Sequence, residues 1–119
     1  MRITIVALLA GLWGYPLWAG QCGLEFCWGA VGISEDDAVG WSRGFETAED
    51  AIAAVQDGCD EKCTTVKSFY DTCGALAVAA NGSWGWGWDD SLAKAKSIAI
   101  SFCSDGGGQC RAKVWACSY

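Results

Sequence analysis

The chain has 119 residues, with 14 acidic and 8 basic side chains, eight cysteines, eight tryptophans and no histidine. This length predicts one domain. The formal charge of −6 argues against nucleic-acid binding, because neutralised phosphates supply most of that affinity, and it argues equally against adhesion to anionic membranes. No histidine is available to share zinc ligation, so no metal site is expected. We expect no other cofactor.

Residues 1–19 predict a secretory signal peptide. Arg2 supplies a positive charge, and an apolar run that reaches Trp18 is shorter than the roughly 20 residues of a membrane span. Ala19 is the small residue that signal peptidase requires. We therefore expect a secreted or periplasmic protein that is cleaved near Ala19, has no stable membrane anchor, and begins with an extension at 20–27.

The remaining residues, 28–119, are expected to form one domain built from two similar halves. The first half spans 28–72 and the second spans 73–118. Both halves open with the same pattern, in which a glycine and an alanine precede alternating aliphatic and small residues. The constant offset between the matching positions predicts an internal repeat.

Each half predicts a strand, a turn, a strand, a helix and a strand. In the first half these are a strand at 28–33, a turn at 36–37, a strand around Trp41, a helix from Thr47 to Cys59 and a strand at 64–69. In the second half they are a strand at 73–78, a turn at 81–82, a strand at 84–88, a helix from Ser91 to Cys103 and a strand at 111–116. The sequence thus predicts an α+β fold of two ββαβ pseudo-repeats. We expect a mainly antiparallel sheet with both helices on one face.

The hairpin of the second half has an Asn-Gly pair at 81–82, which is typical of a two-residue turn. This turn would pair Ala77 with Trp86 and Val78 with Gly85. One face would then carry tryptophans beside alanines, and the other would carry aliphatic side chains beside glycines. Because glycines let a helix approach closely, we expect the helices on the glycine face.

The eight cysteines all follow the predicted signal peptide and indicate disulfides in an oxidising compartment. Each predicted helix ends in a cysteine, and a second cysteine precedes the next strand. This spacing favours the bonds Cys59–Cys63 and Cys103–Cys110. The other four are expected to pair among themselves, with the pairing left open: Cys22, Cys27, Cys73 and Cys117.

The landmarks that the two halves share form a recognisable combination. They are Trp28-Gly29-Ala30, Gly40-Trp41, Cys59, Cys63, the Cys-Gly-Ala-Leu-Ala-Val run at 73–78, Gly85-Trp86, Cys103 and Cys110. The combination resembles DUF4189, a small exported bacterial domain of unknown function, over residues 28–118. The resemblance implies export and a repeated α+β fold, and it carries over no catalytic residue.

Tryptophans at two-residue spacing, Trp84, Trp86 and Trp88, project to one side of the predicted strand, and Trp41 joins them if the two hairpins are neighbours. If buried, they belong to the core. If exposed, they form an aromatic platform for a sugar ring or a protein partner. Arg43 takes the Trp88 position in the first half, which indicates that this end meets solvent. We expect a monomeric, non-enzymatic binding module for an unknown protein or carbohydrate.

The alternative is a small extracytoplasmic hydrolase that uses Asp and Glu carboxylates. Acidic residues cluster at the first hairpin tip, Glu35, Asp36 and Asp37, and before the second helix, Asp89 and Asp90. Turns and helix starts also favour such residues for structural reasons. A hydrolase would require carboxylates from both clusters to meet in one cleft.

Overall fold

The computed structural model describes residues 20–119, so the predicted signal peptide at 1–19 lies outside the described residues. The first half contains β1 (Trp28–Ser34), β2 (Val39–Phe45), α2 (Ala48–Gly58) and β3 (Cys63–Tyr70). The second half follows the same order with β4 (Thr72–Val78), β5 (Trp84–Asp89), α3 (Leu92–Ser104) and β6 (Arg111–Ser118). Within 20–119, no helix is long and apolar enough to cross a membrane.

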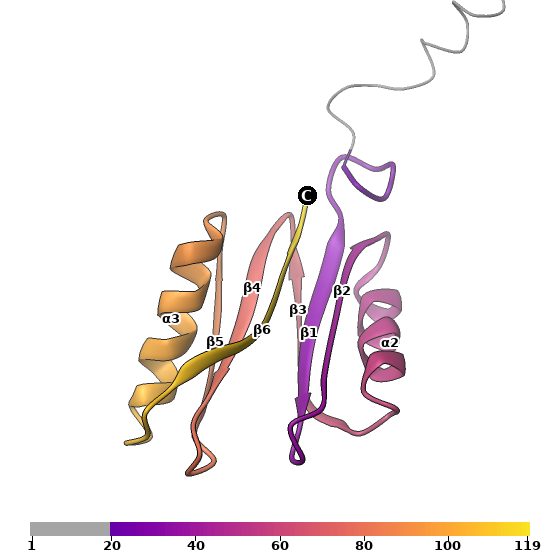
Figure 1. The fold of residues 1–119 in the computed structure, drawn as a ribbon. Coiled ribbons are helices and arrows are strands. Elements are labelled where there is room, and N and C mark those ends of the chain that lie inside the picture. The colour runs from indigo at the N-terminus through magenta and orange to yellow at the C-terminus, as the bar shows by residue number, and fades with distance from the viewer. Residues whose placement is uncertain (1–19) are drawn as a thin grey trace, which may run out of the picture.

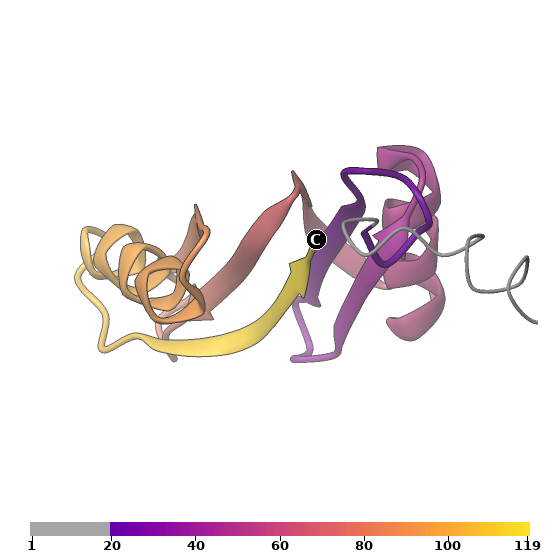
Figure 2. The same ribbon diagram turned by 90° about the horizontal axis from the view of Figure 1, so that it is seen from above.

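The strands form two antiparallel sheets, ordered β2-β1-β3 and β5-β4-β6. The sheets pack face to face, and α2 and α3 cover their outer faces (Figures 1 and 2). The α+β class with two ββαβ units is confirmed, whereas the expected single sheet with both helices on one face is wrong. The physical reason is that both faces of the central strands are apolar, so each sheet needs a cover on both sides.

Two kinds of core follow from this layering. Large aliphatic and aromatic side chains fill most of the space between the sheets: Val31, Ile33, Phe69, Leu76 and Val114, with Ala116 beside them. Small residues fill the space beneath α3, where Ala75 and Ala77 meet Ala95 and Ala99. Beneath α2, Val55 and Ile52 accompany the alanines. In the second half, side-chain size therefore distinguishes the face of the sheet that receives the helix from the face that receives the other sheet.

The β4–β5 hairpin has a three-residue loop, so the predicted two-residue turn is wrong. Ala79 N–H donates to the Ser83 carbonyl at 2.9 Å, and Gly82 N–H donates to the Ala79 carbonyl at 3.1 Å. Gly82 has a φ of +89°, as in a turn followed by a bulge. The extra residue shifts the register, so that Leu76 pairs with Trp86. The tryptophans of β5 therefore share a face with aliphatic residues.

The glycines of β5 lie directly beneath α3, as expected. A Cβ on Gly85 would overlap the carbonyl oxygen of Ala99, and a Cβ on Gly87 would overlap that of Ala95. The helix backbone thus rests on the strand backbone. The glycine face does receive the helix, although alanines rather than large aliphatic residues accompany the glycines.

Four disulfides join all eight cysteines. The predicted Cys59–Cys63 and Cys103–Cys110 bonds are confirmed, and the other four cysteines pair among themselves as Cys22–Cys27 and Cys73–Cys117. A protein with this many disulfides belongs in an oxidising compartment.

The end of β6 is also linked to the first half of the chain. Gly44 N–H donates to the Ser118 hydroxyl oxygen at 3.0 Å, and Gln21 N–H donates to the Tyr119 carbonyl at 2.8 Å. The last strand therefore completes its own sheet and joins the first sheet at one corner.

Candidate functional site

The tryptophans of the predicted platform are divided between two edges of the sandwich. Trp41 lies on β2, the edge strand that faces β6, whereas β5 is the opposite edge strand of the second sheet. Trp41, Trp84 and Trp88 are 56%, 45% and 60% exposed. Trp86 is half-buried against the core, with its ring centroid 6.3 Å from that of Phe69. The residues do not form one continuous platform.

The β5 edge carries aromatic side chains from both sheets. The Lys67 ammonium on β3 lies 5.6 Å from the ring centroid of Trp84. Trp88 lines a cavity of about 400 Å³ together with Trp28 and Tyr70, whose rings lie 4.8 Å apart. Neither Trp28 nor Tyr70 was among the site residues predicted from the sequence.

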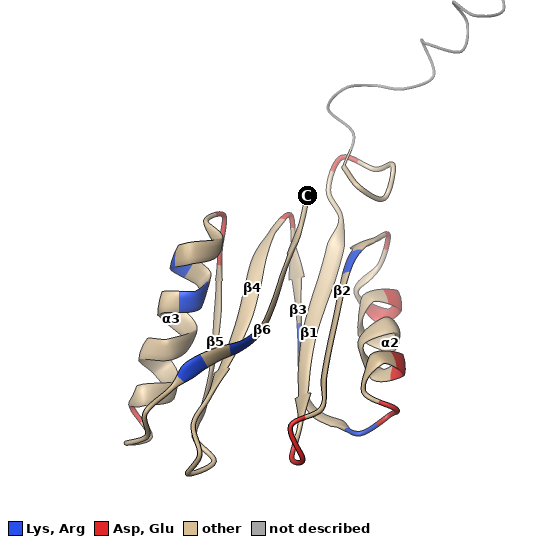
Figure 3. Cartoon of the chain, in the orientation of Figure 1, with Lys and Arg blue, Asp and Glu red and all other residues tan. Residues whose placement is uncertain are grey.

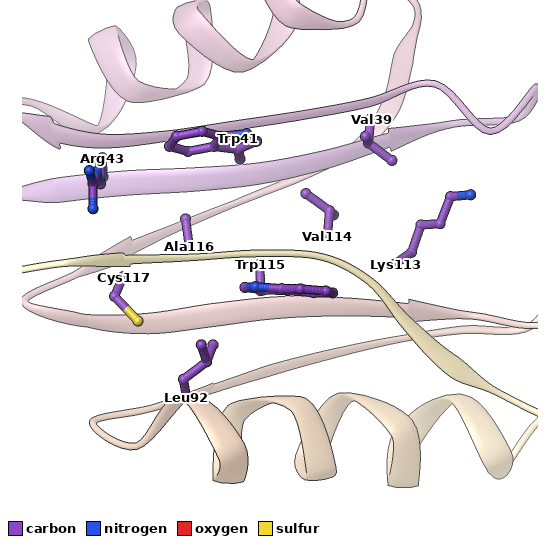
Figure 4. Close-up of a pocket in the computed structure, with 9 residues that line it drawn as sticks. All are labelled: Val39, Trp41, Arg43, Leu92, Lys113, Val114, Trp115, Ala116 and Cys117. Carbon is purple, nitrogen blue, oxygen red and sulfur yellow. The ribbon is translucent and has the colours of Figure 1, made fainter.

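The opposite edge holds the larger cavity, of about 540 Å³, which we call the β2–β6 groove. Its lining residues are Val39, Trp41, Arg43, Leu92, Lys113, Val114, Trp115, Ala116 and Cys117 (Figure 4). Side chains alternate along β6, so Val114 and Ala116 point toward Trp41 while Trp115 points toward α3. The groove therefore follows both sides of β6.

Each exposed indole of the groove has a cation beside it. The guanidinium carbon of Arg43 lies 6.0 Å from the Trp41 ring centroid. The Lys96 ammonium on α3 lies 3.7 Å from the ring centroid of Trp115, which is 42% exposed. Both distances fall within the range of cation–π attraction. The site thus presents flat apolar surfaces next to positive charge.

Trp115 and Lys113 are functional candidates that the sequence analysis missed. Both belong to the strand predicted at 111–116, where Lys, Val, Trp and Ala follow one another. The repeat gave no signal for Trp115, because Ser68 takes the corresponding place: Ser68 pairs with Ala30 on β1 as Trp115 pairs with Ala75 on β4.

The two acidic clusters lie at opposite ends of the molecule, one at the β1–β2 hairpin tip and one before α3 (Figure 3). At the tip, the Ser34 hydroxyl donates to the Asp36 carboxylate, and this hydrogen bond lowers the pKa of Asp36. At the other end, Asp89 accepts a hydrogen bond from Ser91 N–H at 2.8 Å. Each cluster satisfies local backbone or side-chain donors, and the structure does not bring them into one cleft.

Comparisons with known proteins agree with this fold. A family model described as "Domain of unknown function (DUF4189)" matches residues 28–117. The NMR structure of Rv1813c from Mycobacterium tuberculosis is similar, with a TM-score of 0.59 and 24% identity over 76% of this chain and 74% of that chain. No curated protein shows a significant match. At this identity the structural likeness concerns the fold alone.

Proposed function

Because the chain belongs to the DUF4189 family of domains of unknown function, we propose from its surface that it is an exported module that binds a saccharide in the β2–β6 groove. The observation that carries the proposal is the exposure of Trp41. This indole is 56% exposed and stands over a cavity of about 540 Å³. Cavities of about 300–1,000 Å³, lined mainly by apolar groups with a few polar ones, are typical small-molecule sites.

The composition of the walls favours a sugar ring. Trp41 offers a flat indole surface beside the apolar side chains of Val114 and Ala116, and Trp115 offers a second one on the other side of β6. Aromatic rings of this kind stack on the CH-bearing face of a sugar, and the polar edge of the ligand stays near water and the charged side chains. Neither indole belongs to the buried core, so both are available to a ligand.

Export to the periplasm or the extracellular space is part of the proposal. Two observations support it: the signal-peptide pattern at residues 1–19, and the four disulfides, which require an oxidising compartment. Saccharides are abundant outside the cytoplasmic membrane, so the location and the ligand are compatible.

The β5 edge is a second candidate surface, for a protein partner. Trp84 and Trp88 are 45% and 60% exposed and project from the same face of an edge strand. Exposed tryptophans are enriched among the residues that dominate protein–protein affinity. This surface is separate from the groove, so each can be tested without altering the other.

Titration of the oxidised protein, purified after export, with a panel of neutral and acidic oligosaccharides tests the proposed function. Tryptophan fluorescence and calorimetry report binding. We expect Trp41→Ala to lower the affinity for the best ligand at least about tenfold, since a central aromatic contact contributes more than about 1 kcal/mol. Trp88→Ala is the matched control, because it removes an equally exposed indole at the opposite edge.

Both variants should unfold close to the wild-type temperature, because exposed substitutions usually change stability by no more than about 0.5 kcal/mol. Unchanged affinity in Trp41→Ala, or the same loss in Trp88→Ala, would contradict a site in the groove. A large fall in unfolding temperature in Trp41→Ala would instead make this tryptophan part of the structural core.

A further inference from the structure

The charge of the β2–β6 groove is opposite to that of the chain. Arg43 and Lys113 line the groove, and Lys96 lies over Trp115. Among residues 20–119, no Asp or Glu lines it, although the chain carries 14 acidic side chains. In Figure 3 basic residues occur on β2, β6 and α3, and also on β3 and the loop before it, while acidic residues gather at α2 and at the loops. A local cationic surface on an acidic protein indicates a ligand with negative charge.

The two cations of the lining lie at opposite ends of the groove. Arg43 is next to the corner where Gly44 N–H donates to the Ser118 hydroxyl oxygen at 3.0 Å. Lys113 is near the other end (Figure 4), and the strands β2 and β6 diverge in that direction (Figure 1). The two strands are therefore linked beside Arg43, which we call the closed corner, and separate beside Lys113, which we call the open end.

Arg43 is suited to a planar anion. Its guanidinium can donate two parallel hydrogen bonds to one carboxylate, which gives the contact a defined geometry. Trp41 beside it would hold the apolar face of the ring that carries this carboxylate. An arginine and an indole on the same strand are thus placed to contact two features of one sugar residue.

Resting on the proposed function, we infer that the β2–β6 groove binds a carboxylate-bearing saccharide, a uronic-acid-type residue whose ring stacks on Trp41 and whose carboxylate pairs with Arg43. Lys113 contacts the next acidic residue toward the open end. An acidic peptide fits less well, because an extended chain running along β6 would meet the Gly44–Ser118 link at the closed corner.

Calorimetric titration of the oxidised full protein compares three probes: glucuronate- and galacturonate-containing oligosaccharides, neutral oligosaccharides of the same length, and a short polyglutamate peptide. We expect the acidic saccharides to bind at least about tenfold more tightly than the neutral ones, since hydrogen bonds between charged groups are about twice as strong as neutral ones. Rising ionic strength should weaken the binding of the acidic saccharides only, because salt screens exposed charges.

The variants Arg43→Gln and Lys113→Gln, singly and together, test the assignment. They should weaken the binding of acidic saccharides more than that of neutral ones and so remove the preference. Lys67→Gln is the control, because this lysine lies beside Trp84 at the other edge. Near-UV circular dichroism checks that each variant keeps the native packing.

The outcomes separate the inference from the proposed function. Equal affinity for neutral and acidic saccharides, with both lost in Trp41→Ala, overturns the charge preference but keeps the proposed function. Binding of polyglutamate without any saccharide overturns the ligand class. If no saccharide binds, or Trp41→Ala changes nothing, the proposed function itself fails and this inference fails with it.

Discussion

The contact between α3 and β5 depends on two residues that have no side chain, Gly85 and Gly87. Gly87 lies under the Ala95 carbonyl in the second half, and in the first half Ser42 takes the corresponding place. The Ser42 hydroxyl donates to the Ala51 carbonyl at 2.8 Å. Corresponding positions of the two helices are thus packed in two ways. Ser42 forms a hydrogen bond to α2, whereas Gly87 lets the backbone of α3 contact β5 directly.

Replacing Gly85 by Ala should therefore be strongly destabilising. The new Cβ would overlap the Ala99 carbonyl oxygen and the Cys103 amide nitrogen, both of which are backbone atoms of α3. We expect a loss of about 2–3 kcal/mol in the free energy of unfolding, the upper range for overpacking. Urea unfolding followed by circular dichroism measures it.

The control is Gly58→Ala at the end of α2, where the added Cβ would meet only the Gly40 Cα at 3.4 Å. This contact is ordinary, and alanine favours the helix over glycine by up to about 1 kcal/mol. If Gly58→Ala and Gly85→Ala have the same effect, the close approach of α3 is not what makes glycine necessary on β5.

At the level of whole elements, the loop between β4 and β5 decides which face of β5 is buried. Its three residues place Gly82 at φ +89°, and the β1–β2 loop places Asp37 at φ +70° in the corresponding position. Both loops therefore use the same turn with a residue in the left-handed region. Because side chains alternate, a two-residue turn at Asn81-Gly82 in this sequence would shift the pairing by one residue and move every tryptophan of β5 to the helix side.

Deleting Ser83 tests this dependence on register. The deletion keeps the three-residue loop but makes Trp84 the residue that follows it, so Ala77 would pair with Trp86 and indoles would be forced under α3. We expect loss of cooperative unfolding and of the near-UV circular dichroism signal. Ser83→Ala is the control, because it removes only the hydroxyl that donates to the Gly106 carbonyl at 3.1 Å and should keep the native packing. A deletion variant with native packing would show that the core can override the turn.

Local features of this chain could be predicted from its sequence, whereas its layering could not. The helix starts at Thr47 and Ser91 and the bonds Cys59–Cys63 and Cys103–Cys110 depend on residues close in sequence, and the structure has all of them. The second sheet depends on which side of β5 faces inward. The prediction placed the wrong side inward, because it assumed a turn that is one residue shorter than the real loop. The groove escaped prediction because its walls come from β2 and β6, far apart in sequence.

For the whole molecule, the Cys73–Cys117 bond should contribute most to stability among the four disulfides. It closes a sequence separation of 44, against 4 for Cys59–Cys63. The loop-entropy relation assigns about 4 kcal/mol to the long loop and about 2 kcal/mol to the short one. Alanine pairs at each bond, compared by guanidinium unfolding under oxidising conditions, measure the difference. Equal losses would mean that the unfolded chain retains structure that already brings Cys73 and Cys117 together.

The position of β6 has a consequence for the order of events during translocation. On the proposed route of export, the chain emerges with its amino-terminal part first, and β2-β1-β3 can assemble while β6 is still inside the cell. Cys22–Cys27 and Cys59–Cys63 can then oxidise early, but Cys73 has no native partner until Cys117 emerges. During that interval Cys73 is open to bonds with earlier cysteines or with oxidoreductases. The proposed export thus includes a half-folded stage, which ends when β6 emerges.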